Sequence, residues 1–361
     1  MTGVPTLADL TTLRVGGPAE RLVTATTTDE LVDAVREVDD ADEPLLVVGG
    51  GSNLLVGDGP VPGTVVRVAT RGVTIESLDD CSGASVRVAA GEPWDDVVAR
   101  AVAEGWVGVE ALSGIPGSTG ATPVQNVGAY GQEVSSTIAS ARVWDRAGQQ
   151  VVTVANADCR FGYRSSAFKD SPYGSGGTGR YVVLDVLFQL RLGSLSEPVR
   201  YADLARGLGV DVGARVPLAA AREAVLEQRR RRGMVLDDAD PDTWSAGSFF
   251  TNPVLPDTAF EALQARVAER LGGDVSVPAY PAGPGRVKTS AAWLIERAGF
   301  ARGHGLPGPA SLSAKHTLAL TNRGRARSAD LVALAREVRD GVREAFGVTL
   351  VNEPVTVGCS L

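Results

Sequence analysis

Two glycine-rich segments have the composition of a phosphate-binding site. The first, Gly49–Asn53, reads Gly-Gly-Gly-Ser-Asn, and its missing Cβ atoms would let backbone amides approach a phosphate closely. It falls short of a dinucleotide fingerprint, because Leu54 stands where a third glycine is needed and a strand rather than a helix is expected to follow. A phosphate loop and a plain tight turn both remain open for this segment.

The second segment, residues 112–131, mixes glycine and proline with hydroxyl and amide side chains. Such polar groups are costly to bury unless a polar ligand satisfies them. Ile115, Val127 and Tyr130 are too apolar for a solvated surface loop, which is the alternative, so the segment favours a ligand cradle. Its hydrogen-bonding side chains are those of Ser113, Ser118, Thr119, Thr122, Gln125 and Asn126.

Two further turns carry groups suited to binding or to proton transfer. Tyr163 and Arg164 place a phenol and a cation on a glycine-interrupted turn, although a surface arginine is usually only solvated. In Ala246–Pro253, two aromatic residues and a proline define a turn that displays Ser248 and Asn252.

Charged residues at two other places have both a functional and an ordinary explanation. Arg229–Arg232 ends a predicted helix, where the helix macrodipole alone favours cations. Glu353 lies in an otherwise apolar terminal strand, where a carboxylate needs either a partner or an exposed sheet edge.

Composition excludes several classes of protein. The chain has 361 residues, and its 35 Lys and Arg against 43 Asp and Glu leave a net charge of −8, which disfavours a general nucleic-acid-binding surface. Three widely spaced cysteines match neither a disulfide framework nor a zinc motif. His304 and His316, the two histidines, lack the context of a Ser-His-Asp triad or a metal site. We expect no signal peptide in Met1–Leu10 and no membrane-spanning segment.

Periodicity predicts the elements that must position these groups. A strand over residues 21–25, a helix capped by Thr27 and Glu30, and a strand over residues 45–48 predict a small α/β unit. The other predicted helices cover residues 95–104, 218–232, 259–271, 290–298 and 329–346, and the other strands cover 54–56, 85–89, 138–145, 150–154, 181–192 and 349–357. The Ser/Gly-rich segment Ser171–Gly179 is interpreted as a mobile surface loop or insertion.

In chain order, these segments resemble the UDP-N-acetylenolpyruvoylglucosamine reductase family, also called UDP-N-acetylmuramate dehydrogenases. The resemblance covers nearly the whole chain, and Tyr130 with Gly162–Ser165 suggests the long-loop subtype of that family. The eight motifs that carry the resemblance are Thr11–Ala19, Gly49–Asn53, Gly114–Gly117, Gln125–Gly131, Phe161–Ser165, Ala246–Phe250, Lys315-His316 and Glu353.

The resemblance implies an α+β fold with a PCMH-type (vanillyl-alcohol-oxidase-like) FAD-binding region of two α/β subdomains and a C-terminal α+β substrate-binding domain. The first FAD-binding subdomain would cover residues 1–75, joined by the C-terminal strand 348–361. The second would cover residues 76–215, and the substrate-binding domain residues 216–347.

The implied activity is the NADPH-dependent, FAD-mediated reduction of UDP-N-acetylglucosamine enolpyruvate to UDP-N-acetylmuramate in peptidoglycan precursor synthesis. Matching motifs imply that Arg164 and Glu353 polarise the substrate carboxylate and the developing enolate, and that Ser248 gives the proton. The resemblance implies that the flavin is bound noncovalently, and the sequence agrees, since its first histidine is His304 and the FAD-binding region has none for a histidyl-flavin bond. Another flavin oxidase of the same fold and a nonenzymatic nucleotide-sugar-binding protein are the alternatives.

The resemblance also implies which residues bind each ligand. FAD would be held by Gly49, Gly50, Gly51, Ser52, Asn53, Ile115, Pro116, Gly117, Gly120, Thr122, Gln125, Asn126 and Gly128. The UDP-sugar would be held by Tyr130, Tyr163, Tyr201, Arg229, Arg232, Asn252 and His316. Arg232 stands where the family more often has lysine, and a planar guanidinium is not equivalent to a point charge.

We expect a cytoplasmic monomer that binds no metal and no nucleic acid and does not insert into a membrane. The two glycine-rich segments are expected to meet and to hold the flavin beside Arg164, Ser248 and Glu353.

Overall fold

The computed structural model describes residues 5–361, so the expectation of no signal peptide in Met1–Leu10 falls partly outside the described residues. The chain divides into two compact units. The first comprises the described part of Met1–Thr6 with Pro18–Gly51 and Pro60–Leu236, and the second comprises Leu7–Gly17, Ser52–Gly59 and Asp237–Leu361. Neither unit is therefore continuous in sequence.

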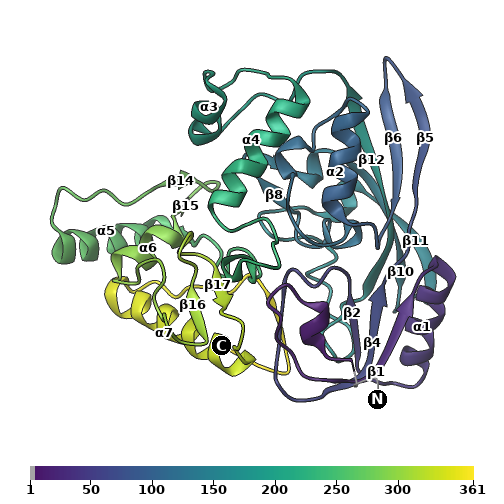
Figure 1. The fold of residues 1–361 in the computed structure, drawn as a ribbon, viewed down its shortest axis with the longest axis horizontal. Coiled ribbons are helices and arrows are strands. Elements are labelled where there is room, and N and C mark those ends of the chain that lie inside the picture. Colours follow the sequence, from purple (N-terminus) through teal and green to yellow (C-terminus); the bar gives the residue numbers. More distant parts are fainter. Residues whose placement is uncertain (1–4) are drawn as a thin grey trace. The chain divides into compact units, whose positions relative to one another are not determined.

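A three-stranded parallel sheet forms one layer of the first unit. Its strands, in spatial order, are β1 (Ala19–Ala25), β4 (Val61–Val68) and β2 (Leu45–Val48). Helix α1 (Thr28–Asp40) packs along this sheet (Figure 1), and it begins at the capping box predicted for Thr27 and Glu30. The edge strand β2 leads directly into Gly49, so its position determines that of the first glycine-rich segment.

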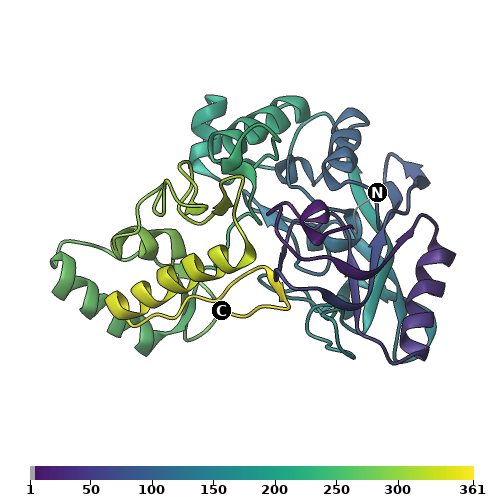
Figure 2. The same ribbon diagram turned by 60° about the horizontal axis from the view of Figure 1, so that its bottom comes forward.

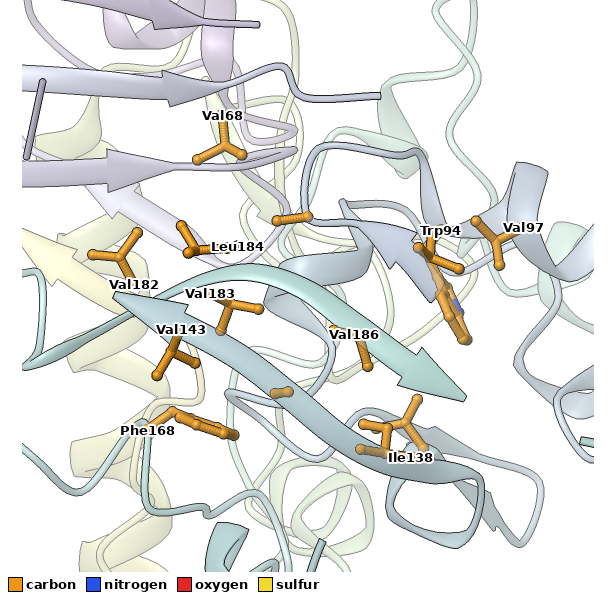
Figure 3. Packing of buried hydrophobic residues seen from close by; sticks show 14 of the residues in the cluster. Val68, Trp94, Val97, Ile138, Val143, Phe168, Val182, Val183, Leu184 and Val186 are labelled. Carbon is orange, nitrogen blue, oxygen red and sulfur yellow. The ribbon is translucent and has the colours of Figure 1, made fainter. Parts of the chain in front are cut away.

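An antiparallel sheet forms the second layer of this unit. Its strands, in spatial order, are β11 (Gln150–Ala155), β10 (Ile138–Asp145), β12 (Tyr181–Leu192), β6 (Gly83–Ala89) and β5 (Val73–Asp79), and β7 (Trp106–Val107) pairs with the end of β12. Figure 3 shows Val68 of β4, Leu184 of β12 and Trp94 of helix α2 (Trp94–Ala103) in the same buried cluster. One apolar core therefore joins the two sheets and α2.

Helices and short turns complete the first unit. Helices α3 (Ala202–Leu208) and α4 (Leu218–Arg231) pack together and against η2 (Glu110–Leu112), around buried residues that include Leu204 and Val225. The remaining short elements are η3 (Thr119–Ala121), β8 (Gly128–Ala129), β9 (Gln132–Glu133), η4 (Val134–Ser136) and η5 (Asn156–Cys159). Helix α4, which the sequence assigned to a substrate-binding domain beginning at residue 216, packs within this unit.

The second unit is built of helices and short strand pairs (Figure 2). Its helices are η1 (Leu7–Leu10), η6 (Pro241–Thr243), α5 (Asp257–Leu271), α6 (Ala291–Arg297) and α7 (Ser328–Phe346). Strand β3 (Leu54–Val56) pairs parallel to β18 (Val355–Val357). An antiparallel sheet contains, in spatial order, β13 (Val254–Pro256), β15 (Arg286–Lys288) and β14 (Tyr280–Pro281). Strand β16 (Ala310–Leu312) pairs antiparallel to β17 (Leu320–Asn322). Helix α7 ends, as predicted, at Gly347 in the left-handed conformation with φ 72°.

The structure differs from the sequence expectations at several places. Strand β4 is the central strand of the parallel sheet, although Pro62 and Gly63 lower its strand propensity. The terminal strand expected over residues 349–357 is confined to Val355–Val357. The segment Ser171–Gly179 is hydrogen-bonded to β2, and its interpretation as a mobile surface loop or insertion stays a prediction. The three-part division of the chain into domains stays a prediction.

Candidate functional site

The two glycine-rich segments meet in the first unit. A Cβ added to Gly50 would lie 2.5 Å from the Cα atom of Gly117, and one added to Gly49 would lie 2.1 Å from Oγ of Ser118. A larger residue at either position would therefore displace the facing backbone or side chain. Side chains are thus excluded where the two loops meet, and glycine backbone of this kind can approach a phosphate closely.

The second glycine-rich segment is attached to the start of helix α2. The backbone amide of Trp94 donates to the carbonyl oxygen of Gly117 (3.0 Å), and that of Thr119 donates to the carbonyl oxygen of Glu92 (2.8 Å). The amide of Gly114 donates to Oδ1 of Asp95 at 2.6 Å. These bonds hold residues 114–119 of the segment against the start of α2.

Asp95 links this loop to helix α4. Its two carboxylate oxygens accept hydrogen bonds from Arg222 at 2.7 and 2.9 Å. Burial alone would raise the pKa of Asp95, but the hydrogen bonds from Arg222 and Gly114 outweigh that effect and hold the pKa below its ordinary value. Asp95 therefore stays ionised where it anchors the loop.

A second pair of segments, Gln125–Gly128 and Phe161–Ser165, is held together by side-chain hydrogen bonds to backbone. Asn126 Nδ2 donates to the carbonyl oxygen of Gly162 (3.1 Å), and a terminal nitrogen of Arg164 donates to that of Gly128 (3.1 Å). Lys169 Nζ bridges Oε1 of Gln125 (3.1 Å) and the carbonyl oxygen of Arg164 (2.9 Å). The structure thus joins two motifs that lie far apart in the sequence.

Three of the predicted site residues other than glycine have left-handed backbone conformations, which are uncommon for such residues. The φ angles are 43° at Asn126, 49° at Tyr130 and 55° at Arg164. Such conformations persist only where surrounding contacts enforce them, and they concentrate at functional sites.

Arg229 lies beside the second glycine-rich segment with a buried, unsatisfied nitrogen. A Cβ added to Gly114 would lie 3.5 Å from Nε of Arg229, and within residues 5–361 this buried Nε has no hydrogen-bond acceptor. A terminal nitrogen of the same guanidinium donates to the carbonyl oxygen of Met234 (2.7 Å). Burial lowers the pKa of Arg229 to about 10, because its cation is poorly solvated. An anion at this place would relieve both deficits.

Tyr130 and Arg232, two other predicted substrate residues of the first unit, lie close enough to Arg229 to interact with it electrostatically. The ring of Tyr130 packs edge-on against that of Tyr201, with 5.9 Å between centroids. Burial raises the pKa of Tyr130, although Arg229 and Arg232 oppose the shift. Arg232 itself pairs with Asp203 at 3.2 Å, so its charge is already balanced.

The first unit also contains the predicted substrate residue Tyr163 and a cavity lined in part by Tyr130. The guanidinium of Arg164 lies 5.4 Å from the ring centroid of the exposed Tyr163. A cavity of about 280 Å³ has Tyr130, Arg200 and the buried Glu110 among its lining residues. Glu110 accepts hydrogen bonds from the amides of Gly108 and Glu197, so the carboxylate is satisfied by the protein itself.

In the second unit, Ser248, Asn53 and Glu353 are brought together by backbone pairing. The amide of Glu353 donates to the carbonyl oxygen of Phe249 (2.8 Å), next to Ser248. Asn53 Nδ2 donates to the carbonyl oxygen of Glu353 at 3.4 Å, and the amide of Val355 donates to that of Asn53 at 2.9 Å. The β3–β18 strand pair begins two residues after Glu353 and continues this pairing. Glu353 is half-buried, so the alternative of a fully exposed sheet edge does not describe it.

His316 and Asn252 lie within three residues of backbone groups that hydrogen-bond to or neighbour Phe249. The amide of Phe249 donates to the carbonyl oxygen of Leu318 (2.7 Å), two residues beyond His316. Oδ1 of Asn252 accepts from the amide of Ala291 at the start of α6 (3.0 Å), so this side chain has a structural contact of its own.

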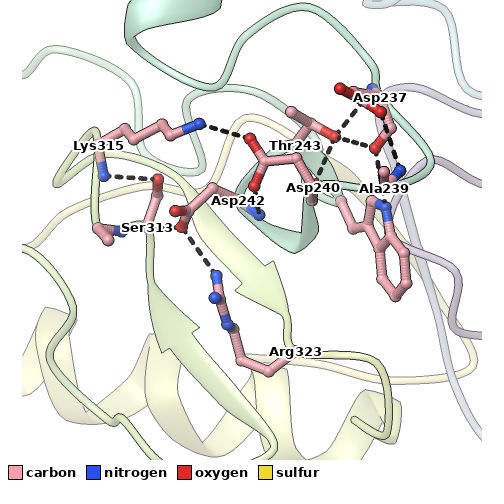
Figure 4. A network of polar contacts seen from close by, with 10 residues as sticks. Asp237, Ala239, Asp240, Asp242, Thr243, Ser313, Lys315 and Arg323 are labelled. Carbon is pink, nitrogen blue, oxygen red and sulfur yellow. Dashed lines mark hydrogen bonds and ion pairs between the residues drawn. The ribbon is translucent and has the colours of Figure 1, made fainter.

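A polar network that sequence reasoning missed supports the turn that carries His316 (Figure 4). Buried Asp242 accepts hydrogen bonds from the amide of Ala314 (2.9 Å) and from Arg323 (2.8 Å). Asp240 accepts from Lys315 Nζ and from the amide of Asp242. The Asp-Pro-Asp sequence of residues 240–242 is a recognisable helix-start signal, but its partners 70 or more residues away leave no local trace.

The predicted site residues are divided between the two units. The first unit holds Gly49, Gly50, Gly51, Ile115, Pro116, Gly117, Gly120, Thr122, Gln125, Asn126, Gly128, Tyr130, Tyr163, Arg164, Tyr201, Arg229 and Arg232. The second holds Ser52, Asn53, Ser248, Asn252, His316 and Glu353. The predicted meeting of Arg164 with Ser248 and Glu353 stays a prediction.

The described part of the chain lacks two kinds of feature. None of the helices within residues 5–361 is long and apolar enough to cross a bilayer. In the same range, no three or more His, Cys, Asp or Glu side chains are grouped in a way that could hold a metal ion.

Family models match both halves of the chain. A model described as the C-terminal domain of UDP-N-acetylenolpyruvoylglucosamine reductase matches residues 240–357, and one described as an FAD binding domain matches residues 19–154.

Whole-chain relatives carry the same description. The UDP-N-acetylenolpyruvoylglucosamine reductase of Streptomyces coelicolor is 60% identical over 98% of this chain and 90% of its own length. That of Thermobifida fusca is 58% identical over 98% of this chain and 97% of its own length. The crystal structure of the Thermus caldophilus enzyme is 27% identical, with a TM-score of 0.63 over 98% of this chain and 97% of that one. The predicted α+β fold with an FAD-binding region is therefore confirmed.

Proposed function

The chain belongs to the UDP-N-acetylenolpyruvoylglucosamine reductase family, and we propose that it performs this reduction with Arg164, Ser248 and Glu353 as catalytic residues. It is a flavin-dependent oxidoreductase that reduces UDP-N-acetylglucosamine enolpyruvate to UDP-N-acetylmuramate in peptidoglycan synthesis, with NADPH as reductant. The alternatives, a different flavin oxidase and a nonenzymatic sugar-nucleotide binder, are not favoured.

The observation that carries the proposal is the contact of Gly49 and Gly50 with Gly117 and Ser118. The contact brings two glycine-rich loops together where a Cβ at Gly49 or Gly50 has no room, so the backbone of such loops can approach FAD phosphates closely, within a unit that matches an FAD binding domain. When bound, FAD would supply the hydride chemistry that links NADPH to the enolpyruvyl double bond. The protein supplies position and charge.

Arg164 and Glu353 act on the enolpyruvyl carboxylate, where negative charge develops during the reduction. The guanidinium of Arg164 is half-buried and is oriented by its hydrogen bond to the carbonyl oxygen of Gly128. A cation held in place in this way stabilises developing charge without reorganising, and this is usually the largest contribution to catalysis. Glu353 shares in polarising the carboxylate and the enolate.

Ser248 gives the proton that completes the reduction. The turn at Gly247 (φ 71°) and the fully buried Phe249 hold it between fixed neighbours. A hydroxyl is a weak acid, so its contribution depends on such positioning.

Arg229 binds the pyrophosphate of the UDP-sugar. The buried Nε without an acceptor and the lowered pKa are the properties of a guanidinium that awaits an anionic partner. Arg232 contributes less, because Asp203 already balances its charge. Tyr130, Tyr163, Tyr201, Asn252 and His316 complete the set of substrate-binding residues that we propose.

The test follows the absorbance of NADPH with the purified protein, which should be yellow from bound FAD. We expect NADPH consumption that depends on UDP-N-acetylglucosamine enolpyruvate. Turnover with oxygen alone would indicate a different flavin oxidase, and UDP-sugar binding without NADPH oxidation would indicate a binding protein. A colourless protein that takes up no FAD would overturn the proposal. We further propose that the protein is a cytoplasmic monomer, in keeping with its nucleotide substrates.

A further inference from the structure

Arg146 is a fully buried arginine at the turn that follows β10. Only 1% of its surface is exposed, and its charge is balanced by Asp39, in the last turn of α1, which accepts from Nε and from a terminal nitrogen. The motifs of the family resemblance do not include either residue. A buried ion pair of this kind is costly to form unless its remaining hydrogen bonds are also satisfied.

Those remaining bonds go to the backbone of residues 171–180, which we call the strap. The second terminal nitrogen of Arg146 donates to the carbonyl oxygens of Thr178 (2.9 Å) and Gly179 (3.2 Å). The guanidinium also lies 4.7 Å from the ring centroid of Tyr173. Arg146 therefore contacts the strap at several places. These contacts explain why a Ser/Gly-rich segment has a defined conformation.

The base of the strap is closed by a second ion pair. Arg180 donates to both carboxylate oxygens of Asp145 at 2.6 Å. The amide of Arg146 donates to the carbonyl oxygen of Arg180 (3.0 Å), and the amide of Arg180 to that of Ser171 (2.8 Å). The strap is thus a closed loop anchored on the β10–β11 hairpin.

The outer side of the strap pairs with the free edge of β2. The amide of Leu45 donates to the carbonyl oxygen of Ser175 (3.0 Å), and the amide of Val47 donates to Oγ1 of Thr178 (2.7 Å). The amide of Thr178 donates back to the carbonyl oxygen of Leu45 at 3.3 Å. This four-residue strand is otherwise paired only with β4, so the strap supplies the second side of its support.

We propose that Arg146 is a positioning residue for FAD binding. It holds the strap, the strap supports β2, and β2 positions the Gly49-Gly50 loop. Gly49 lies two positions after Val47, and the loop approaches Gly117 and Ser118 so closely that a small displacement would alter this contact. The inference rests on the proposed function, since it requires that this loop binds FAD. It also gives the segment Ser171–Gly179 a role.

The test compares FAD affinity in three variants by titrating flavin fluorescence. Thr178→Val removes only the acceptor for the Val47 amide, and we expect the FAD dissociation constant to rise about 5-fold, the factor of one net hydrogen bond. Arg146→Lys cannot reproduce the fork to Asp39 and two carbonyls, so we expect a rise of about 10-fold or more. Arg142→Lys is the matched control, because Arg142 pairs with Asp185 on β12 instead of with the strap.

A second readout does not depend on flavin. Amide hydrogen exchange at Leu45 and Val47 should be faster in Arg146→Lys than in the parent protein, while Arg142→Lys should leave these amides unchanged. At saturating FAD, Thr178→Val should recover normal kcat and normal KM for the UDP-sugar.

FAD dissociation constants within 2-fold of the parent in both strap variants would overturn the inference, whatever their thermal stability. If Arg146→Lys fails to fold, Thr178→Val decides the question. If the parent chain itself binds no FAD, the proposed function fails instead, and the exchange rates at Leu45 and Val47 still report whether Arg146 holds β2.

Discussion

Ser248 and Glu353, 105 positions apart, become neighbours because the segment after Gly247 pairs with the segment before Pro354. The bridge between Phe250 and Asn352 and the bond from the Glu353 amide to Phe249 carry this pairing. A hydroxyl and a carboxylate on paired backbone have little freedom to move apart, which would suit the proposed roles of Ser248 and Glu353 on one substrate.

The role of Ser248 predicts that its removal separates the two half-reactions. In Ser248→Ala, NADPH should still bleach the flavin absorbance, while its return on adding the UDP-sugar slows by about 10²- to 10⁴-fold, the range for a lost general acid. Stopped-flow absorbance measures both steps. Thr251→Val, in the same segment, should be near normal in both. Equal slowing of both steps in Ser248→Ala would mean that the residue shapes the site without giving a proton.

Glu353 offers a second test at this scale. Glu353→Gln keeps the size of the side chain and the backbone bonds to Phe249 and Asn53, but removes the charge. We expect a severe loss of kcat with FAD retained, measured by steady-state NADPH oxidation and by the flavin content of the protein. Near-normal turnover would assign Glu353 to the support of the terminal strand alone.

Arg229 and Arg232 should differ although they lie three residues apart. Arg229 has a buried Nε without an acceptor, whereas Arg232 is paired with Asp203. Arg229→Lys should raise KM for the UDP-sugar by about 10-fold or more, because a point charge cannot replace the fork, and Arg232→Lys should raise it less. Arg230→Lys, at a residue paired with exposed Glu223, serves as the control. Similar KM values for the Arg229 and Arg232 variants would contradict the assignment.

At the scale of elements, what the sequence could predict depended on how local the signal was. Strand β12 has the predicted bounds Tyr181–Leu192, and α1 begins at the predicted capping box, because alternation and capping are encoded within a few residues. Arg146 and Asp95 went unrecognised, because each is defined by partners on other elements. The two glycine-rich loops were expected to meet, but the particular contact between Gly50 and Gly117 depends on the fold and had no local signal.

The hydrogen bonds of Asp242 in the η6 turn lead us to expect an effect on binding of the UDP-sugar. Asp242→Asn keeps an acceptor for the Ala314 amide but loses the charge that pairs with Arg323, so the turn before His316 should loosen. We expect destabilisation of about 3 kcal/mol, the lower end for a broken buried ion pair, and a raised KM for the UDP-sugar. Denaturant unfolding and steady-state kinetics measure the two effects. An unchanged KM despite the lost stability would separate the network from His316.

At the scale of the whole molecule, the chain enters the second unit three times, at Leu7, Ser52 and Asp237. The glycine-rich segment Gly49–Asn53 spans one of these crossings, with Gly51 in the first unit and Ser52 in the second. The motif Gly49–Asn53 helped to identify the family, but it did not indicate which compact unit each of its residues would join.

Acid should destabilise both units through carboxylates whose pKa values are lowered on folding. Burial alone would raise the pKa of Asp95 and of Asp240, but their hydrogen bonds to Arg222 and Lys315 hold both values below the ordinary 3.8. The stabilisation is then complete above pH 3.8, and it is lost as pH falls through the lower folded-state values. The free energy of unfolding should decline toward about pH 3, and Asp95→Asn should flatten this decline for the unit that binds FAD. Denaturation followed by flavin fluorescence from about pH 6 to about pH 3 measures it. The same acid dependence in Asp95→Asn and in the parent would show that the Arg222 pair does not control it.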